Sequence, residues 1–390
     1  MALANLKSIN FVVKSVFSQK SNWLLSGFLW LLFIFPAQAI ELRVAIKKDV
    51  STLKVGSSTS ATVKNDRGQQ IGQLTPMSPL AVKAQRNKIS INDLVGKTEL
   101  IIEPTENGYV WIGDRWYRGT TRLIREHNTI TAINHVDLED YLYSVVGAEA
   151  VSSWPIEALK AQAVAARSYA LYKRNSQAND IYDVDTTVGT QVYKGLDTEY
   201  TTTHEAVNST LGQIMTYNNE VILAAFHSSS GGHTENVEDV WTSPLPYLRA
   251  VVDYDHTAPV FEWQQVFPVS RIKTLVAGIG NIRGLQPVKM TPRGRVITMK
   301  ITGDRGSTNL TGKEIRKALK LRSTLFRMST DGSNVKVSGR GFGHGLGLSQ
   351  WGAYYLAQKG VDYQRILAHY YQNANLTQLE QNRSSTANNK

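Results

Sequence analysis

Apolar and polar residues alternate at the beginning of the region that follows residue 39. The apolar positions are Ile40, Leu42, Val44 and Ile46. This period of two predicts a half-buried β-strand. Short apolar runs continue to about residue 134, separated by turn sequences such as those at 66–68 and 107–108, which are typical of hairpins. The pattern therefore predicts a β-rich N-terminal lobe over residues 40–134.

Four aromatic residues gather in the last part of this lobe, around a Gly-Asp turn at 113–114. They are Tyr109, Trp111, Trp116 and Tyr117. The segment 108–118 is predicted as strand, turn and strand. Its rings can stack on sugar rings or pack against one another across the two strands, and we favour cross-strand packing.

A different pattern over 155–174 predicts a long helix. The segment is rich in alanine, has no internal Gly or Pro, and has Pro155 where a first helical turn tolerates it. Apolar residues recur along it at helical spacing, so one face is expected to be buried. They are Ile156, Leu159, Ala163 and Ala166.

Further elements complete a mixed α+β pattern over residues 135–374. Extended segments are predicted at 191–193, 212–226 and 296–301, and helices at 202–211, 313–319, 350–358 and 363–371. Residues 375–390 are mostly Asn, Gln, Ser and Thr and are predicted to be a disordered polar tail.

The N-terminus has the pattern of a secretory signal. Residues 1–39 contain lysines but no acidic residue, then an apolar run from Trp23 to Phe35 and an Ala-x-Ala ending at Ala39. A membrane anchor is the alternative, but the run is short for a span, which needs about 20 residues. We expect cleavage after Ala39 and an exported protein of the periplasm or cell envelope, with membrane contact only if the segment is retained.

Composition narrows the chemistry. The 390 residues include no cysteine, which excludes disulfides, cysteine-ligated zinc, iron–sulfur clusters and a thiol nucleophile. The net charge is +11, which suits an anionic polymer or lipid surface or only aids solubility. There is no long basic run, so nucleic acid is not an expected partner.

Glu149 is a carboxylate within an apolar neighbourhood, 145–151. Burial should raise its pKa, and a carboxyl group that stays protonated near neutral pH can act as a general acid. The residue also precedes the predicted helix, whose dipole would favour the anion. These effects oppose each other, and a capping or salt-bridged glutamate is the alternative. The nearby acids Asp137, Glu139 and Asp140 are expected to be surface or helix-start charges.

Four segments, in this order, resemble the SpoIID/LytB family of peptidoglycan-acting proteins. They are Tyr141 to Pro155 with the helix behind it, Gln191 to Gly195, Phe226 to Glu235 with its continuation to Leu248, and the glycine-rich run Gly339 to Ala353. The resemblance covers roughly residues 135–373. It implies a mixed α+β SpoIID-like catalytic domain with a groove, at 135–374.

The resemblance also implies an activity. In the SpoIID branch the glutamate at the position of Glu149 is the catalytic residue of a lytic transglycosylase, which cuts peptidoglycan glycan strands and leaves 1,6-anhydro ends. The LytB branch instead enhances a separate cell-wall amidase, which makes an amidase the alternative partner. A plain wall-binding module is a third interpretation. No cofactor is expected, and no metal site is predicted, because the metal-containing family members use cysteine.

Several residues are candidates for substrate binding. Lys160 and Arg167 share a helix face with Val164 and can hold a carboxylate or form a solvated stripe. Ser229 and Ser230 can hydrogen-bond sugars. The candidates in the glycine-rich run are His344, Ser349 and Gln350. We expect His344 to contact substrate or orient Glu149, although a core histidine is the alternative. Ser349 and Gln350 are expected to cap the next helix, with Gln350 also able to contact an N-acetyl group.

Overall fold

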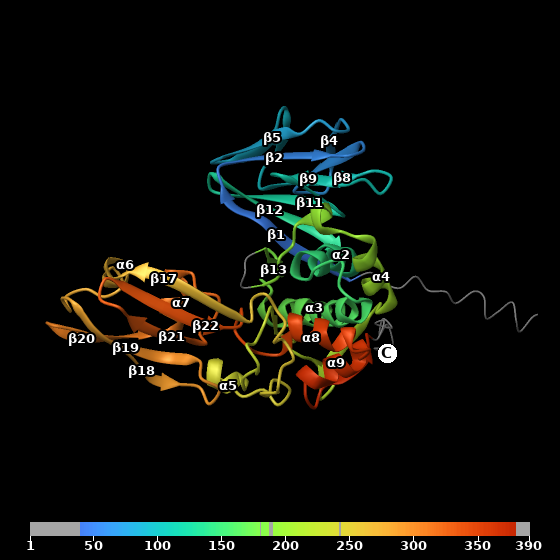
Figure 1. Ribbon diagram of the computed structural model, residues 1–390. Coiled ribbons are helices and arrows are strands. Elements are labelled where there is room, and N and C mark those ends of the chain that lie inside the picture. Colours follow the sequence, from blue (N-terminus) through green and yellow to red (C-terminus); the bar gives the residue numbers. More distant parts are fainter. Residues whose placement is uncertain (1–39, 180, 187–189, 242, 380–390) are drawn as a thin grey trace, which may run out of the picture. The chain divides into compact units, whose positions relative to one another are not determined.

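The computed structural model describes residues 40–379, with gaps at 180, 187–189 and 242 (Figure 1). Within this part, a β-rich N-terminal region is followed by helices and further strands, which confirms the predicted α+β class. The signal segment predicted for residues 1–39 lies outside the described residues.

The N-terminal region is built from two antiparallel-rich sheets. The larger has the order β13 (Val184–Asp185), β1 (Glu41–Val50), β12 (Thr129–Asp137), β11 (Thr120–Glu126), β8 (Glu99–Pro104), β3 (Ala61–Asn65) and β4 (Gln70–Leu74). The smaller has the order β10 (Arg115–Tyr117), β9 (Val110–Ile112), β2 (Thr52–Ser57), β5 (Leu80–Gln85), β6 (Lys88–Ile91) and β7 (Leu94–Gly96).

Side chains of this region confirm two predictions. Leu42 and Val44 in β1 are fully buried, as the alternating pattern predicts. Trp111 and Trp116 are register partners in β9 and β10, and their ring centroids lie 5.2 Å apart in an edge-on arrangement. The aromatic residues therefore pack across the hairpin.

The strands lead directly into helices without a break in the core. β12 ends at Asp137, whose Oδ1 accepts hydrogen bonds from the N–H groups of Glu139 and Asp140 and caps α2 (Leu138–Glu149). One hydrophobic core joins β1, β12, α2 and α3 (Ile156–Gln177). Helix α2 was not predicted from the sequence, because its apolar residues do not form a long repeat.

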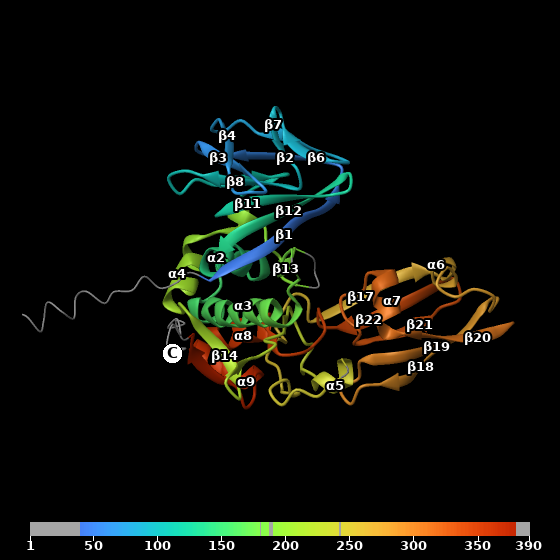
Figure 2. The same ribbon diagram turned by 180° about the vertical axis from the view of Figure 1, so that it is seen from behind.

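The predicted alanine-rich helix is confirmed as α3. It packs against α4 (Thr201–Ser209), α8 (Gln350–Gln358), α9 (Tyr363–Tyr370) and β14 (Gln213–Tyr217). Both views show α4, α8 and α9 near α3, and Figure 2 also shows β14 (Figure 1, Figure 2). The expected face, with Leu159 and Ala163, belongs to the first core. The opposite face, with Ala161 and Val164, belongs to a second core. The expectation of a single buried face was therefore wrong: small alanine side chains allow packing on both sides.

Short elements connect these helices around the second core. They are the 3₁₀ turn η1 (Gly195–Thr198), β15 (Glu220–Val221), β16 (Phe226–His227), α5 (Val237–Val240), β23 (Leu348–Ser349) and β24 (Asn375–Gln378). Strand β24 pairs with β14, and Leu376 packs against the second core. The predicted disordered tail is therefore wrong for Asn375–Gln378, and residues 380–390 lie outside the described residues.

A third core lies in the segment between β16 and β23. Its elements are β17 (Glu262–Pro268), α6 (Val269–Lys273), β18 (Ile282–Met290), β19 (Val296–Gly303), β20 (Gly306–Thr311), α7 (Gly312–Leu319), β21 (Phe326–Thr330) and β22 (Asn334–Arg340). The strands form two sheets, in the orders β17-β22-β21 and β18-β19-β20. The predicted strand at 296–301 and helix at 313–319 are confirmed as parts of β19 and α7.

Candidate active site around Glu149

Glu149 is the last residue of α2 and is partly buried. Its Oε1 accepts a hydrogen bond of 2.8 Å from the backbone N–H of Val192. The side-chain amide of Gln350, from the start of α8, also hydrogen-bonds to the carboxyl group, and the ammonium group of Lys194 contributes a favourable charge. The first, second and fourth sequence segments thus meet at one carboxyl group.

The surroundings of Glu149 favour its protonated form. Burial raises its pKa above the ordinary glutamate value, and it outweighs the hydrogen bonds from Val192 and Gln350 and the charge of Lys194. The sequence suggested an opposing helix dipole, but α3 begins only at Ile156. Glu149 instead ends α2, where the negative end of the dipole acts in the same direction as burial.

The glycine-rich run positions Gln350. Strand β23 pairs in parallel with β16, with Phe226 opposite Leu348. Gly347 has a φ of +65°, and an added Cβ would lie 2.1 Å from the carbonyl oxygen of Ala225. Only glycine fits this position. Ser349 then caps α8 by accepting a hydrogen bond from Gly352, which confirms its predicted capping role. The side chain of Gln350 also donates to Gln162 Oε1 at 3.3 Å.

Residues that the sequence did not single out complete the surroundings. Tyr169 lies near Glu149, and burial together with that carboxylate raises the pKa of Tyr169 to about 12. The hydroxyl of Tyr141 donates to Gln191 Oε1, and Gln191 in turn donates to the carbonyl of Ala166. These bonds hold the segment before Val192 against α3. In the sequence, only the motif at 191–195 pointed to this region. The roles of Tyr141, Tyr169 and Gln191 depend on contacts between segments that are distant in the chain.

Three partly exposed aromatic rings lie on the segments that flank Glu149 and Gln350. The ring centroid of Trp154, in the loop after α2, lies 5.0 Å from that of Trp351 and 5.1 Å from that of Tyr354. The centroids of Trp351 and Tyr354 are 5.3 Å apart. Such amphipathic rings can pack against the apolar face of a sugar. Trp351 retains exposed surface at the start of α8.

Arg167 does not reach the site. Its side chain is fully buried, with Nη2 2.6 Å from Glu139 Oε2 and with Nη1 donating to the carbonyl of Gln213. A guanidinium group enclosed in this way has no surface for a polymer, so the structure corrects its proposed role in substrate binding. The physical reason is that α2, α4 and β14 pack over this part of α3 and supply its partners, Glu139 and the carbonyl groups of Val207 and Gln213. Lys160 remains partly exposed and pairs with Glu157 at 2.9 Å.

Ser229 and Ser230 are also buried rather than presented to a ligand. The hydroxyl of Ser229 donates to Asp255 Oδ2 at 2.5 Å, and that of Ser230 donates to Asp253 Oδ2. The N–H groups of Gly231 and Gly232 complete the partners of Asp255. The expectation that these serines bind sugars is corrected, because their hydroxyls satisfy buried carboxylates.

His344 packs between two other rings. Its ring centroid is 5.2 Å from that of His227 and 5.4 Å from that of Trp241. Its Nδ1 accepts the N–H of Leu346 at 3.0 Å, and burial, with nearby arginine charges, lowers its pKa to about 3. The imidazole is therefore neutral at physiological pH, and Glu149 is not among its contacts in the described residues. Within the described residues, no group of three or more potential metal ligands occurs.

Comparisons with known proteins identify the family of the chain. Residues 126–217 match the family model of SpoIID, the stage II sporulation protein. Stage II sporulation protein D of Bacillus subtilis is 34% identical over 274 residues, which span 64% of this chain and 77% of that protein. The chain belongs to the SpoIID/LytB family. This membership gives it a cell-wall-related function of the SpoIID type.

Other relatives of this SpoIID/LytB protein extend the comparison. An uncharacterized protein of Brachyspira hyodysenteriae is 31% identical over 340 residues, covering 85% of the chain and 91% of the relative. The amidase enhancer of Bacillus subtilis is 30% identical over 291 residues, covering 60% of the chain but 40% of that protein. Residues 254–347 match a domain of unknown function, DUF8618. In the described part of the chain, no helix is long and apolar enough to span a membrane.

Proposed function

We propose that this SpoIID/LytB protein is an exported peptidoglycan lytic transglycosylase with Glu149 as its general acid and base. It cleaves glycan strands between N-acetylmuramic acid and N-acetylglucosamine and leaves 1,6-anhydro ends. The observation that carries the proposal is the raised pKa of a partly buried carboxyl group held by Val192 and Gln350. Residues 1–39 direct export to the periplasm or cell envelope in this proposal.

The reaction requires one carboxyl group and no water. Protonated Glu149 gives its proton to the glycosidic oxygen as the bond from that oxygen to C1 breaks. The C6 hydroxyl of the same N-acetylmuramic acid attacks C1, and its proton passes to the carboxylate, which restores the acid. Hydrolytic glycosidases commonly use two carboxyl groups. Within the described residues, the groups that shift the pKa of Glu149 include no second carboxylate, which supports the single-acid route.

The neighbours of Glu149 suit both halves of this cycle. Burial keeps the proton on the acid before reaction. The N–H of Val192, the amide of Gln350 and the charge of Lys194 stabilise the carboxylate that forms after proton transfer. Trp154, Trp351 and Tyr354 offer a surface on which sugar rings can stack.

A second candidate function follows from the similarity to an amidase enhancer. In this alternative the protein binds peptidoglycan without cutting it and stimulates an N-acetylmuramoyl-L-alanine amidase. Glu149 would then be a structural residue, and its replacement would leave the stimulation unchanged.

Digestion of purified glycan strands tests the proposal. Intact and peptide-stripped strands are incubated with wild type and Glu149→Gln, and the products are analysed by mass spectrometry for the anhydro end, which is one water lighter than a hydrolysed end. We expect anhydro products from wild type on at least one substrate and none from Glu149→Gln, with Glu205→Gln as an exposed glutamate control. No products from wild type on either substrate, with stimulation of an added amidase, would support the alternative.

A further inference from the structure

The positive charge of the protein is concentrated in one segment. Residues 254–347 contain 16 Lys and Arg but five Asp and Glu, an excess of eleven positive charges, and the whole chain also has a net charge of +11. The residues outside this segment therefore carry equal numbers of positive and negative charges. This segment holds the third core, whereas Glu149 and Gln350 lie outside it. A charge confined in this way points to a local partner rather than to general solubility.

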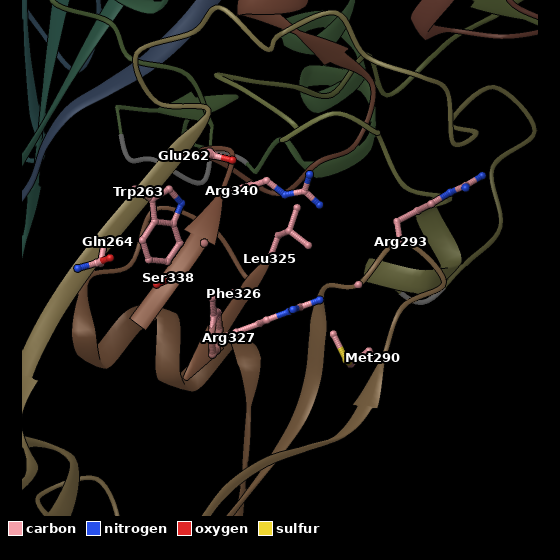
Figure 3. A pocket seen from close by; sticks show the side chains of 12 residues that line it. Glu262, Trp263, Gln264, Met290, Arg293, Leu325, Phe326, Arg327, Ser338 and Arg340 are labelled. Atoms are coloured by element: carbon pink, nitrogen blue, oxygen red, sulfur yellow. The ribbon is translucent and has the colours of Figure 1, made fainter. Parts of the chain in front are cut away.

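The segment contains a cleft of about 770 Å³ between strands β17, β21 and β22 and the turn after β18. Arg327 lies on β21, Arg340 at the end of β22 and Arg293 in the turn. Figure 3 shows Arg293 across the cleft from Trp263, with the side chains of Arg327 and Arg340 extending into the space between them. The positive side chains thus come from three separate backbone segments.

The guanidinium groups of Arg327 and Arg340 are available to a ligand in the cleft, and Arg293 lies at its rim with its guanidinium group directed outward (Figure 3). All three residues are exposed, and within the described residues no hydrogen bond or ion pair engages their side chains. By contrast, the neighbouring Arg295 is buried beside Glu235. The cleft has a rigid floor, because Trp263 and Phe326 are buried and Trp263 Nε1 donates to the carbonyl of Gly341 at 2.9 Å.

We propose that this cleft is a second substrate-binding site, which takes carboxylate groups of the glycan polymer that is cut at Glu149. The planar, forked guanidinium group matches a carboxylate with two parallel hydrogen bonds. In peptidoglycan this chemistry comes from two sources: the lactyl carboxylates of N-acetylmuramic acid where the peptide is missing, and the carboxylates of the stem peptides. The ligand identity rests on the proposed function, whereas the anion site rests on the cleft itself.

The chain connects the cleft to the candidate active site. Arg340 and Gln350 are ten residues apart, joined by the glycine-rich run. A fully extended chain of this length spans at most about 36 Å, so the two sites lie within that distance. One glycan strand can therefore occupy both, and the cleft would hold the strand while Glu149 acts on it.

Binding measurements on charge-matched variants test the proposal. The full-length protein carrying Glu149→Gln, which prevents cutting, is compared with the same protein bearing Arg327→Ala and Arg340→Ala or, as control, Lys300→Ala and Lys317→Ala. The control lysines are exposed, belong to the same segment and do not line the cleft. The probes are peptide-stripped strands, intact strands, stripped strands with methyl-esterified carboxylates, and a glycerol-phosphate polymer. Thermal unfolding confirms that each variant is folded.

We expect the cleft pair to weaken binding to carboxylate-bearing strands at least about tenfold, because two charge-assisted contacts are lost. The control pair should change it less than about threefold. Esterified strands should bind as weakly as the cleft variant does, and the stripped and intact strands show which carboxylate is used. Equal weakening by both pairs, undiminished binding of esterified strands, or preferential binding of the phosphate polymer would each overturn the proposal.

A variant with the opposite expected effect excludes misfolding as the explanation. Glu262 lines the same cleft and is the register partner of Arg340. Its carboxylate repels an anionic ligand, so Glu262→Gln should tighten binding, and unchanged or weaker binding would contradict a carboxylate site. The two proposals can be rejected independently. If strands bind at the cleft through their carboxylates but wild type gives no anhydro products, the binding site is supported and the transglycosylase activity is rejected.

Discussion

The carboxyl group of Glu149 accepts a hydrogen bond from the backbone N–H of Val192, which lies 43 residues further along the chain. This contact joins the end of α2 to the loop before η1, and the amide of Gln350 reaches the same carboxyl group from the C-terminal part. A catalytic acid must be protonated before the reaction, and its carboxylate must be stabilised after it has given up the proton. Burial provides the first property, and these donors provide the second.

The stability of the protein should depend on pH through Glu149. Because its pKa is higher in the folded protein than in the unfolded chain, the folded state binds this proton more tightly. The free energy of unfolding therefore falls as pH rises from the ordinary glutamate pKa through the raised value, and it stays lower above that. Glu149→Gln should be more stable than wild type near neutral pH, and the difference should vanish in acid.

Thermal unfolding at a series of pH values measures this difference. The exposed Glu205→Gln serves as control and should change stability by less than about 0.5 kcal/mol at any pH. A Glu149→Gln protein that is less stable than wild type at neutral pH would show that the carboxylate makes a net stabilising contact in the folded state.

Removal of Gln350 should shift the pH dependence of cutting. Gln350 lowers the pKa of Glu149 by hydrogen bonding to its carboxylate, so Gln350→Ala should raise that pKa further. The rate falls when the acid loses its proton, and the alkaline limit of activity should therefore move to higher pH, while the maximal rate falls by roughly tenfold to a hundredfold. Gln358→Ala, on the same helix and bonded to Tyr354, should leave the profile in place.

Substitutions of Arg167 and Lys160 should differ in their effect on stability, because one cation is buried and the other is partly exposed on the same helix. Arg167→Ala leaves Glu139 without its buried partner, and we expect a loss of about 3–5 kcal/mol in the free energy of unfolding. Lys160→Ala breaks a partly exposed pair and should cost about 1 kcal/mol or less. Urea denaturation measures both. A normally stable Arg167→Ala protein with weakened strand binding would restore the substrate-binding interpretation.

Two glycines with positive φ should differ sharply when changed to alanine. At Gly347 an added Cβ would lie 2.1 Å from the carbonyl oxygen of Ala225, whereas at Gly332 no atom lies within 4 Å. Both substitutions carry backbone strain of about 1–2 kcal/mol, and Gly347→Ala adds overpacking of about 1–3 kcal/mol. Because Gly347 precedes β23 and Gln350, Gly347→Ala should also lose activity. Equal stability losses in the two variants would indicate that β16 and β23 can separate without cost.

The sequence by itself predicted many of the local elements and pointed to Glu149 as the proposed acid. The alternation that begins at Ile40 predicted β1, the alanine-rich repeat predicted α3, and the segments around Glu149 and Gly339–Ala353 indicated the family. These signals depend on neighbours in the chain: the period of apolar residues, glycine at every second position, and a carboxylate among apolar residues.

Only the tertiary structure decided which side chains share a site. It brought Val192 and Gln350 to Glu149, and it buried Arg167, Ser229 and Ser230. The exposure of a polar side chain depends on which distant segment packs over it. The burial of both faces of α3, and the placement of three arginines around one cleft, follow from contacts between residues far apart in the chain, on which hydrophobic periodicity carries no information.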